Sequence, residues 1–144
     1  MNRKSLLLMA LVATMIGSAQ AAPKLKPGKW KITTTMENPM MAAPGEQVTE
    51  ECIRDSEYDF KQLMQELPQT NCEPVKPKTS GRTVTWELSC INPMNPAEKI
   101  TGQGHFTGKR DSAEGIMRIS MNLPGMGEQT FTTRWHHEYL GKCD

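Results

Sequence analysis

A period-two alternation of apolar and polar residues is the feature that most constrains the fold of this chain. The clearest run covers residues 82–91, where one face carries Val84, Trp86, Leu88 and Cys90. Successive side chains of a strand point to opposite faces, so this pattern predicts a strand with one buried face. Related stretches predict further strands, at residues 28–36, 47–53, 98–107, 115–121 and 129–140, with residues 72–78 as an edge strand.

One stretch follows the helical period instead. Apolar residues at i, i+3, i+4 and i+7 spacing lie between a capping Asp55 and the helix-breaking Pro68; they are Phe60, Leu63, Met64 and Leu67. This pattern predicts one short helix over residues 55–67. The expected fold class is therefore α+β: a curved, mostly antiparallel sheet of about seven strands that forms an incomplete barrel. The helix is expected to pack on the concave apolar face of that sheet.

The first residues of the chain have the layout of a secretory signal peptide. Arg3 and Lys4 precede an uncharged apolar run at residues 6–16, and the small residues Ala19 and Ala21 follow it. The run is shorter than the roughly 20 residues that a membrane-spanning helix needs. We expect residues 1–21 to be cleaved and residues 22–144 to form a single domain. This predicts a periplasmic or secreted protein.

Composition narrows the expected partners. Removal of residues 1–21 takes away two basic residues, so the formal net charge falls from +1 to −1. No stretch of the remaining chain is strongly basic, which argues against nucleic acid as a partner. No second apolar run reaches spanning length, so we expect no membrane span in the processed chain. We also expect the protein to be a monomer.

Four cysteines lie beyond the predicted cleavage site, an even number that indicates two disulfides in an exported domain. Cys72 and Cys90 flank a predicted hairpin that turns at residues 79–82, and counting outward from the turn places them almost opposite each other. This favours a Cys72–Cys90 pair and leaves Cys52 with Cys143. A zinc site is the alternative, but the chain lacks the C-x-x-C spacing typical of one.

Several short motifs follow one another along the chain. Pro27-Gly28-x-Trp30 is followed by Thr33-Thr34-Thr35-Met36 and a loop rich in proline and methionine. The order continues with Cys52, Cys72, Ser80-Gly81-x-x-Val84-x-Trp86, Cys90, a Gly-x-Gly strand, a Gly-x-Met strand and Gly141-x-Cys143. In these motifs the chain resembles a family of uncharacterised exported bacterial domains. The resemblance implies a periplasmic or secreted domain with disulfides among these cysteines, and no established activity.

Methionine is the one compositional oddity. Met36, Met40 and Met41 cluster around the first predicted hairpin, and Met94 and Met126 lie in other predicted loops. Thioethers are soft ligands that select Cu(I), so we hypothesise a copper site at Met36, Met40 and Met41, with a histidine as a further ligand. The simpler interpretation is that these residues fill irregular apolar contacts, and no other cofactor is expected.

The histidines and carboxylates give little support for catalysis. His136 and His137 are neighbours on a predicted strand, so they point to opposite faces and cannot chelate one ion together. We expect His136 on the exposed face and His137 on the same face as Trp135. The chain has no G-x-S-x-G and no H-E-x-x-H motif. No catalytic residue is assigned, and a non-enzymatic protein is expected.

Three functional hypotheses follow. The first is a non-enzymatic exported binding module that takes a small apolar ligand, a lipid or an envelope partner on its curved sheet. The second is a periplasmic Cu(I)-binding protein that uses the loop methionines. The third is a structural or interaction protein of the cell envelope whose sheet edges pair with another chain.

Overall fold

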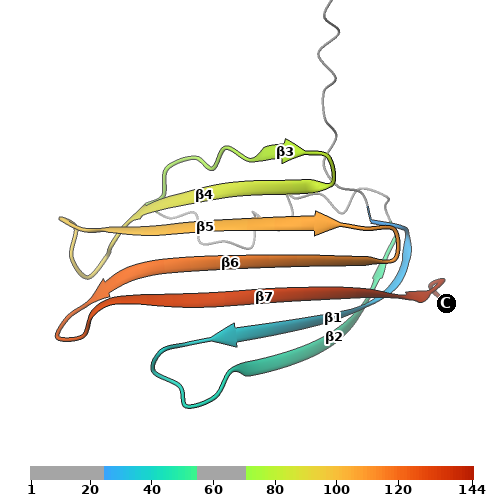
Figure 1. Cartoon of the computed structure of the whole chain (residues 1–144), viewed down its shortest axis with the longest axis horizontal. Helices are drawn as coiled ribbons and strands as arrows, with labels where there is room; N and C mark the ends of the chain where they lie inside the picture. Colours follow the sequence, from blue (N-terminus) through green and yellow to red (C-terminus); the bar gives the residue numbers. More distant parts are fainter. Residues whose placement is uncertain (1–24, 55–70) are drawn as a thin grey trace, which may run out of the picture.

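The computed structural model describes residues 25–54 and 71–144, and in these residues every regular element is a β-strand. The seven strands form one antiparallel sheet in the order β2-β1-β7-β6-β5-β4-β3 (Figure 1). The strands are β1 Gly28–Glu37, β2 Gly45–Ile53, β3 Lys78–Ser80, β4 Thr83–Ile91, β5 Lys99–Gly108, β6 Ser112–Leu123 and β7 Gly127–Gly141. The alternation of the sequence therefore predicted six of the seven strands correctly apart from their ends, and it misplaced the edge strand β3.

The expected fold class is wrong in two respects. The described part of the chain is all-β, and its sheet is open rather than an incomplete barrel. Strands β2 and β3 follow each other in the chain but occupy opposite edges of the sheet, so no ladder closes it. The predicted helix at residues 55–67 lies outside the described residues.

The edge strand β3 is shorter and later than expected. Residues 72–78 were predicted to form it, yet the ladder with β4 covers only Lys78–Ser80, and Cys72 makes an isolated bridge to Cys90. Pro74 and Pro77 explain the difference, because proline has no N–H to donate to a ladder.

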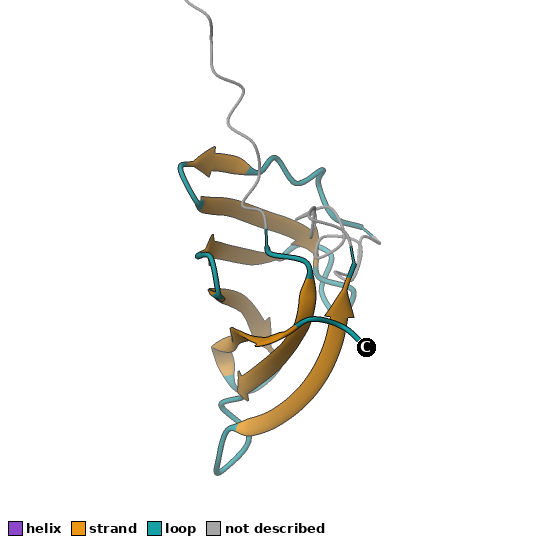
Figure 2. Cartoon of the chain, turned by 90° about the vertical axis from the view of Figure 1, so that its right-hand side faces the viewer, coloured by secondary structure: helices purple, strands orange, loops and turns teal. Residues whose placement is uncertain are grey.

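The sheet curves strongly (Figure 2), and its two faces differ in chemistry. One face carries the core, to which Leu25 adds from the segment before β1. Trp30 from β1 and Val84 from β4 belong to the same buried cluster although three strands separate them in the sheet. The sheet therefore curls around its apolar face. The rest of the buried cluster is Ile53, Trp86, Leu88, Cys90, Phe106, Ala113 and Met117.

Glycines in β5 make room for this core. Gly102 lies opposite Leu88 of β4, and Gly104 lies opposite Trp86. In the structure the group that approaches Gly104 most closely is the indole of Trp86, its partner on β4. A Cβ at position 104 would overlap that ring, so glycine here is a packing requirement.

Two disulfides join the sheet to its flanking segments, in the pairing that the hairpin argument favoured. Cys72 is bonded to Cys90, and their Cα atoms are 3.9 Å apart. Cys52 at the edge strand β2 is bonded to Cys143, which follows β7, across 91 residues of sequence. The second bond therefore links an edge strand to the C-terminal segment.

Candidate ligand-binding site on the polar face

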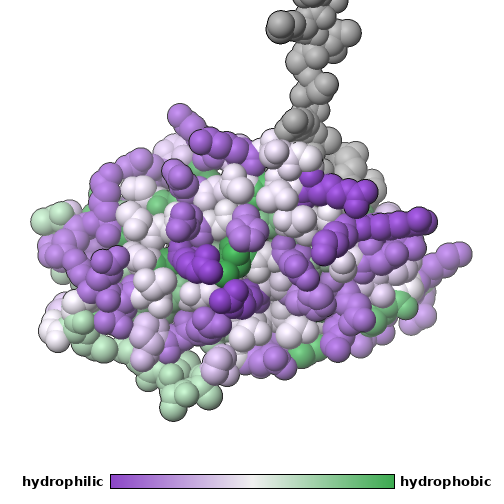
Figure 3. Space-filling view, viewed as in Figure 1, coloured by the Kyte–Doolittle hydropathy of each residue, from purple (hydrophilic) through white to green (hydrophobic). Residues whose placement is uncertain are grey.

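The face of the sheet opposite the core is mostly hydrophilic, and Figure 3 shows it directly. Its side chains come from alternate positions of β1, β7, β6 and β5, which the ladders place side by side. An open hollow of about 500 Å³ lies over these strands. That volume falls in the range of small-molecule sites. The lining residues are Thr33, Thr35, His105, Glu114, Gly115, Ile116, Arg118, Arg134, Trp135 and His136.

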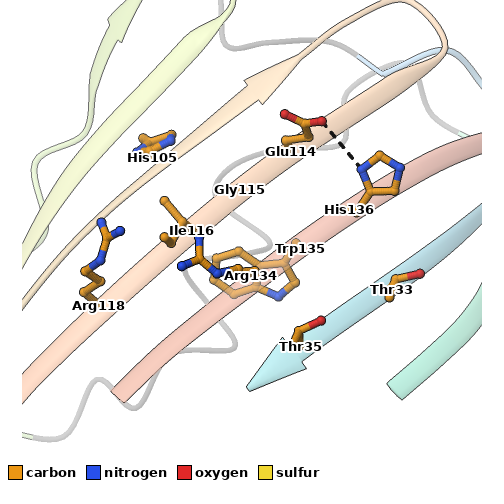
Figure 4. Close-up of a pocket in the computed structure, with 10 residues that line it drawn as sticks. All are labelled: Thr33, Thr35, His105, Glu114, Gly115, Ile116, Arg118, Arg134, Trp135 and His136. Carbon is orange, nitrogen blue, oxygen red and sulfur yellow. Dashed lines mark ion pairs between the residues drawn. The ribbon is translucent and has the colours of Figure 1, made fainter. Parts of the chain in front are cut away.

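Ile116 is the apolar centre of this polar surface. It lies opposite Arg134 on β7 and opposite His105 on β5. Figure 4 shows its side chain beside those of Arg118 and Arg134. Only 7% of the residue is exposed, because longer polar side chains surround it. The hollow thus combines an apolar floor with polar and charged walls.

The charges around the floor are unevenly paired. Arg134 donates from Nε to Glu37 Oε1 at 3.2 Å, and His136 Nδ1 lies 3.7 Å from Glu114 Oε1. Arg118 has no ion pair within the described part of the chain. Its five guanidinium N–H groups are therefore available to an oxyanion, and Arg134 adds a second positive charge.

The neighbouring strand β1 supplies neutral hydrogen-bonding groups. Thr33 lies opposite His136 and Thr35 lies opposite Arg134, so both hydroxyls stand at the rim of the hollow (Figure 4). A hydroxyl both donates and accepts, which suits a ligand that carries oxygen atoms. The site as a whole fits a small molecule with an anionic group and a short apolar part.

The predicted copper ligands lie elsewhere. Met36 is the last residue but one of β1, Met40 and Met41 lie in the loop to β2, and all three are more than half exposed. His137 is opposite Ile32 and His136 is opposite Thr33, so the ladder brings neither histidine beside Met36. Nothing in the structure tests copper binding, and the site stays a prediction. In the described residues there is no group of three or more His, Cys, Asp or Glu placed to hold a metal ion.

His137 is buried on the apolar face, as its alternation with Trp135 predicted. Its ring packs edge-on against Phe106, with the centroids 5.5 Å apart. Burial, with a smaller contribution from the charge of His136, lowers the pKa of His137 to about 4. The residue is therefore a neutral part of the core at neutral pH.

Sequence reasoning did not identify the hollow, and in particular it missed Ile116 and Arg118. A signal was present, because residues 115–117 read Gly-Ile-Met and place an apolar side chain on the polar face of the strand. The register of β5, β6 and β7 was needed to show which side chains surround that isoleucine.

The described residues contain no helix with the length and apolarity needed to cross a membrane. No curated protein and no solved structure matches the chain. A protein-family model does match, over residues 25–143, which includes every strand and all four cysteines. The chain therefore belongs to the family described as a protein of unknown function, DUF3617.

Proposed function

We propose that this protein is an exported, non-enzymatic binding module that takes a small organic anion into the hollow on its polar face. The observation that carries the proposal is the pairing of Arg118, which has no ion pair in the described residues, with the apolar floor at Ile116. A carboxylate or another oxyanion would accept hydrogen bonds from the guanidinium, and the apolar part of the ligand would cover the isoleucine.

Export is part of this proposal. Residues 1–21 have the charged, apolar and small-residue regions of a signal peptide, and the family match begins after them, at residue 25. Two disulfides are consistent with a periplasmic or extracellular protein, since such bonds persist in oxidising compartments. The proposed mature protein is one domain that begins at Ala22.

The proposed site differs from the inner apolar face that the sequence suggested for a ligand or lipid. On that face, large side chains of the core are almost completely buried, with Trp30 at 0% and Trp86 at 2% exposure. Burial of this kind is typical of a packed core. The open hollow on the polar face is the better supported location.

Titration of the processed protein with benzoate and with inorganic phosphate tests the proposal. The two probes share an oxyanion, and only benzoate adds an apolar part. We expect both probes to shift the NMR signals of Arg118 and Ile116. Arg118→Gln is expected to weaken the binding of each probe by about tenfold, because a charged hydrogen bond is lost. Arg82→Gln is the matched control, because Arg82 lies in the exposed turn between β3 and β4. Absence of binding by both probes, or equal binding by Arg118→Gln, contradicts the proposed function.

A further inference from the structure

Three hairpin loops lie together at one end of the sheet. Strands β1, β4 and β6 all run toward this end, so their connections to β2, β5 and β7 all lie there, side by side in the order of the strands (Figure 1). The loops contain residues 38–44, 92–97 and 124–126. We call them the methionine loops, because they hold Met40, Met41, Met94 and Met126.

The methionine loops are uncharged, and their methionine side chains are exposed. None of their residues carries a charge. Met40, Met41, Met94 and Met126 are 58%, 56%, 57% and 52% exposed. The turns at the other end of the sheet are charged, since one contains Arg82 and the other reads Lys-Arg-Asp at residues 109–111. The difference between the two ends indicates that the methionine end meets an apolar environment.

The amide of each loop methionine is already hydrogen-bonded within the protein. Met40 donates its amide to Asn38 Oδ1 at 2.9 Å, and Met94 donates to Asn92 Oδ1 at 3.0 Å, so two Asn-Pro-Met segments form the same turn. The amides of Met41 and Met126 donate to the carbonyls of Asn38 and Leu123. Five prolines in these loops have no N–H to satisfy: Pro39, Pro44, Pro93, Pro96 and Pro124.

We propose that the methionine loops dock on the surface of a lipid bilayer, with the methionine side chains inserted into its interface. Hydrocarbon offers no hydrogen-bond partners, and each of the four loop methionines already has its amide bonded within the protein. The apolar groups are carried by three loops rather than by one groove. Three loops at one end of the sheet can contact a broad surface such as a bilayer at the same time (Figure 1).

The charges beside the loops indicate the kind of headgroup. Glu46, Glu98 and Glu128 stand at the strand ends or loop ends next to the methionine loops and have no ion pair in the described residues. Glu37 and Lys99 are paired with Arg134 and Glu73. This acidic border repels anionic lipids, so the surface fits zwitterionic headgroups.

Co-sedimentation with phosphatidylcholine vesicles tests the proposal on the processed protein, whose mass confirms that residues 1–21 are absent. We expect binding that survives high salt and weakens when phosphatidylglycerol replaces part of the lipid. Substitution of Met40, Met94 and Met126 by Asp is expected to reduce the bound fraction by at least about tenfold, because a carboxylate disfavours insertion. Leu140→Asp is the matched control, because Leu140 is 46% exposed near the opposite end of the sheet.

Circular dichroism of each variant checks that the sheet is intact. Oxidation of the wild-type protein with hydrogen peroxide gives a second test that needs no substitution. Methionine sulfoxide is polar, so oxidation of the loop methionines is expected to release the protein from vesicles. The proposal fails if the protein does not sediment with phosphatidylcholine vesicles, or if Leu140→Asp loses as much binding as the triple variant. If the wild-type protein does not bind vesicles but forms dimers in sedimentation velocity, and the triple variant is monomeric, the loops mediate self-association instead.

Discussion

The indole of Trp86 on β4 lies against the Cα of Gly104, its partner on β5, in the space that a side chain would fill. We therefore expect Gly104→Ala to destabilise the protein, since Trp86 must move and the carbonyl of Ile116 limits the space behind it. Overpacking of this kind costs about 1–3 kcal/mol. Chemical denaturation measures the loss in unfolding free energy.

Gly102→Ala is the matched control for that substitution. Gly102 is on the same face of the same strand, but its nearest neighbours would lie 3.3 Å from an added Cβ. A smaller loss of stability is expected there. Equal losses at the two positions would show that Trp86 is not the cause.

The second prediction concerns the stability of the protein in acid. His137 has its pKa lowered to about 4 in the folded state, whereas an unfolded histidine titrates at about 6.5. Between these values the unfolded chain binds more protons, so the unfolding free energy falls as the pH decreases from about 6.5 to 4. The full loss is on the order of 3 kcal/mol.

Urea unfolding at several pH values measures this loss. Replacement of His137 by Phe is expected to flatten the profile in that range, and replacement of the exposed His136 by Asn is expected to keep most of it. If the His137→Phe profile retains the wild-type slope, another group is responsible.

The third prediction separates the two disulfides. Cys52–Cys143 closes a loop of 91 residues and Cys72–Cys90 one of 18. In the chain-entropy model the longer loop contributes about 4.6 kcal/mol and the shorter about 3 kcal/mol. We expect the Cys52→Ala/Cys143→Ala double variant to lose more stability than Cys72→Ala/Cys90→Ala in thermal unfolding. The reverse order would show that local strand geometry outweighs loop entropy.

The fourth prediction separates the contributions of the apolar floor and of the Arg118 guanidinium to ligand binding. Ile116→Ala removes the apolar floor and leaves the guanidinium of Arg118 in place. We expect the substitution to weaken benzoate binding by about threefold to tenfold through lost apolar contact, with little effect on phosphate binding. Titration of both probes against the same preparation gives the comparison. An equal loss for both probes would indicate that the substitution disturbs Arg118 rather than the floor.

Local patterns explain why so much of the sheet was predictable. The alternation from Thr83 to Ile91 results from one buried face, and the Gly81-Arg82 turn sets the register that brings Cys72 opposite Cys90. These relationships involve residues close in sequence, so the strands, this turn and the Cys72–Cys90 pair are readable from the chain itself. The Cys52–Cys143 pair spans 91 residues and followed only by elimination.

The errors concern relationships between distant segments. Pairing of β1 with β7 joins residues about one hundred positions apart, and no local pattern indicates whether β2 and β3 then meet. The hollow was missed for the same reason, because Ile116 is surrounded only when β5 and β7 are paired in register with β6. The role of Gly104 likewise depends on the direction in which Trp86 points.

Pairing of Lys29 with Gly141 has a consequence for the connectivity of the chain. The first and last strands are neighbours within the sheet, and the described chain begins and ends at the side away from the methionine loops (Figure 1). A circular permutant that joins these ends and opens at Gly81-Arg82 would keep every strand pair. Attachment of the protein to a solid support through Asp144 would leave the loops facing solution, in one uniform orientation.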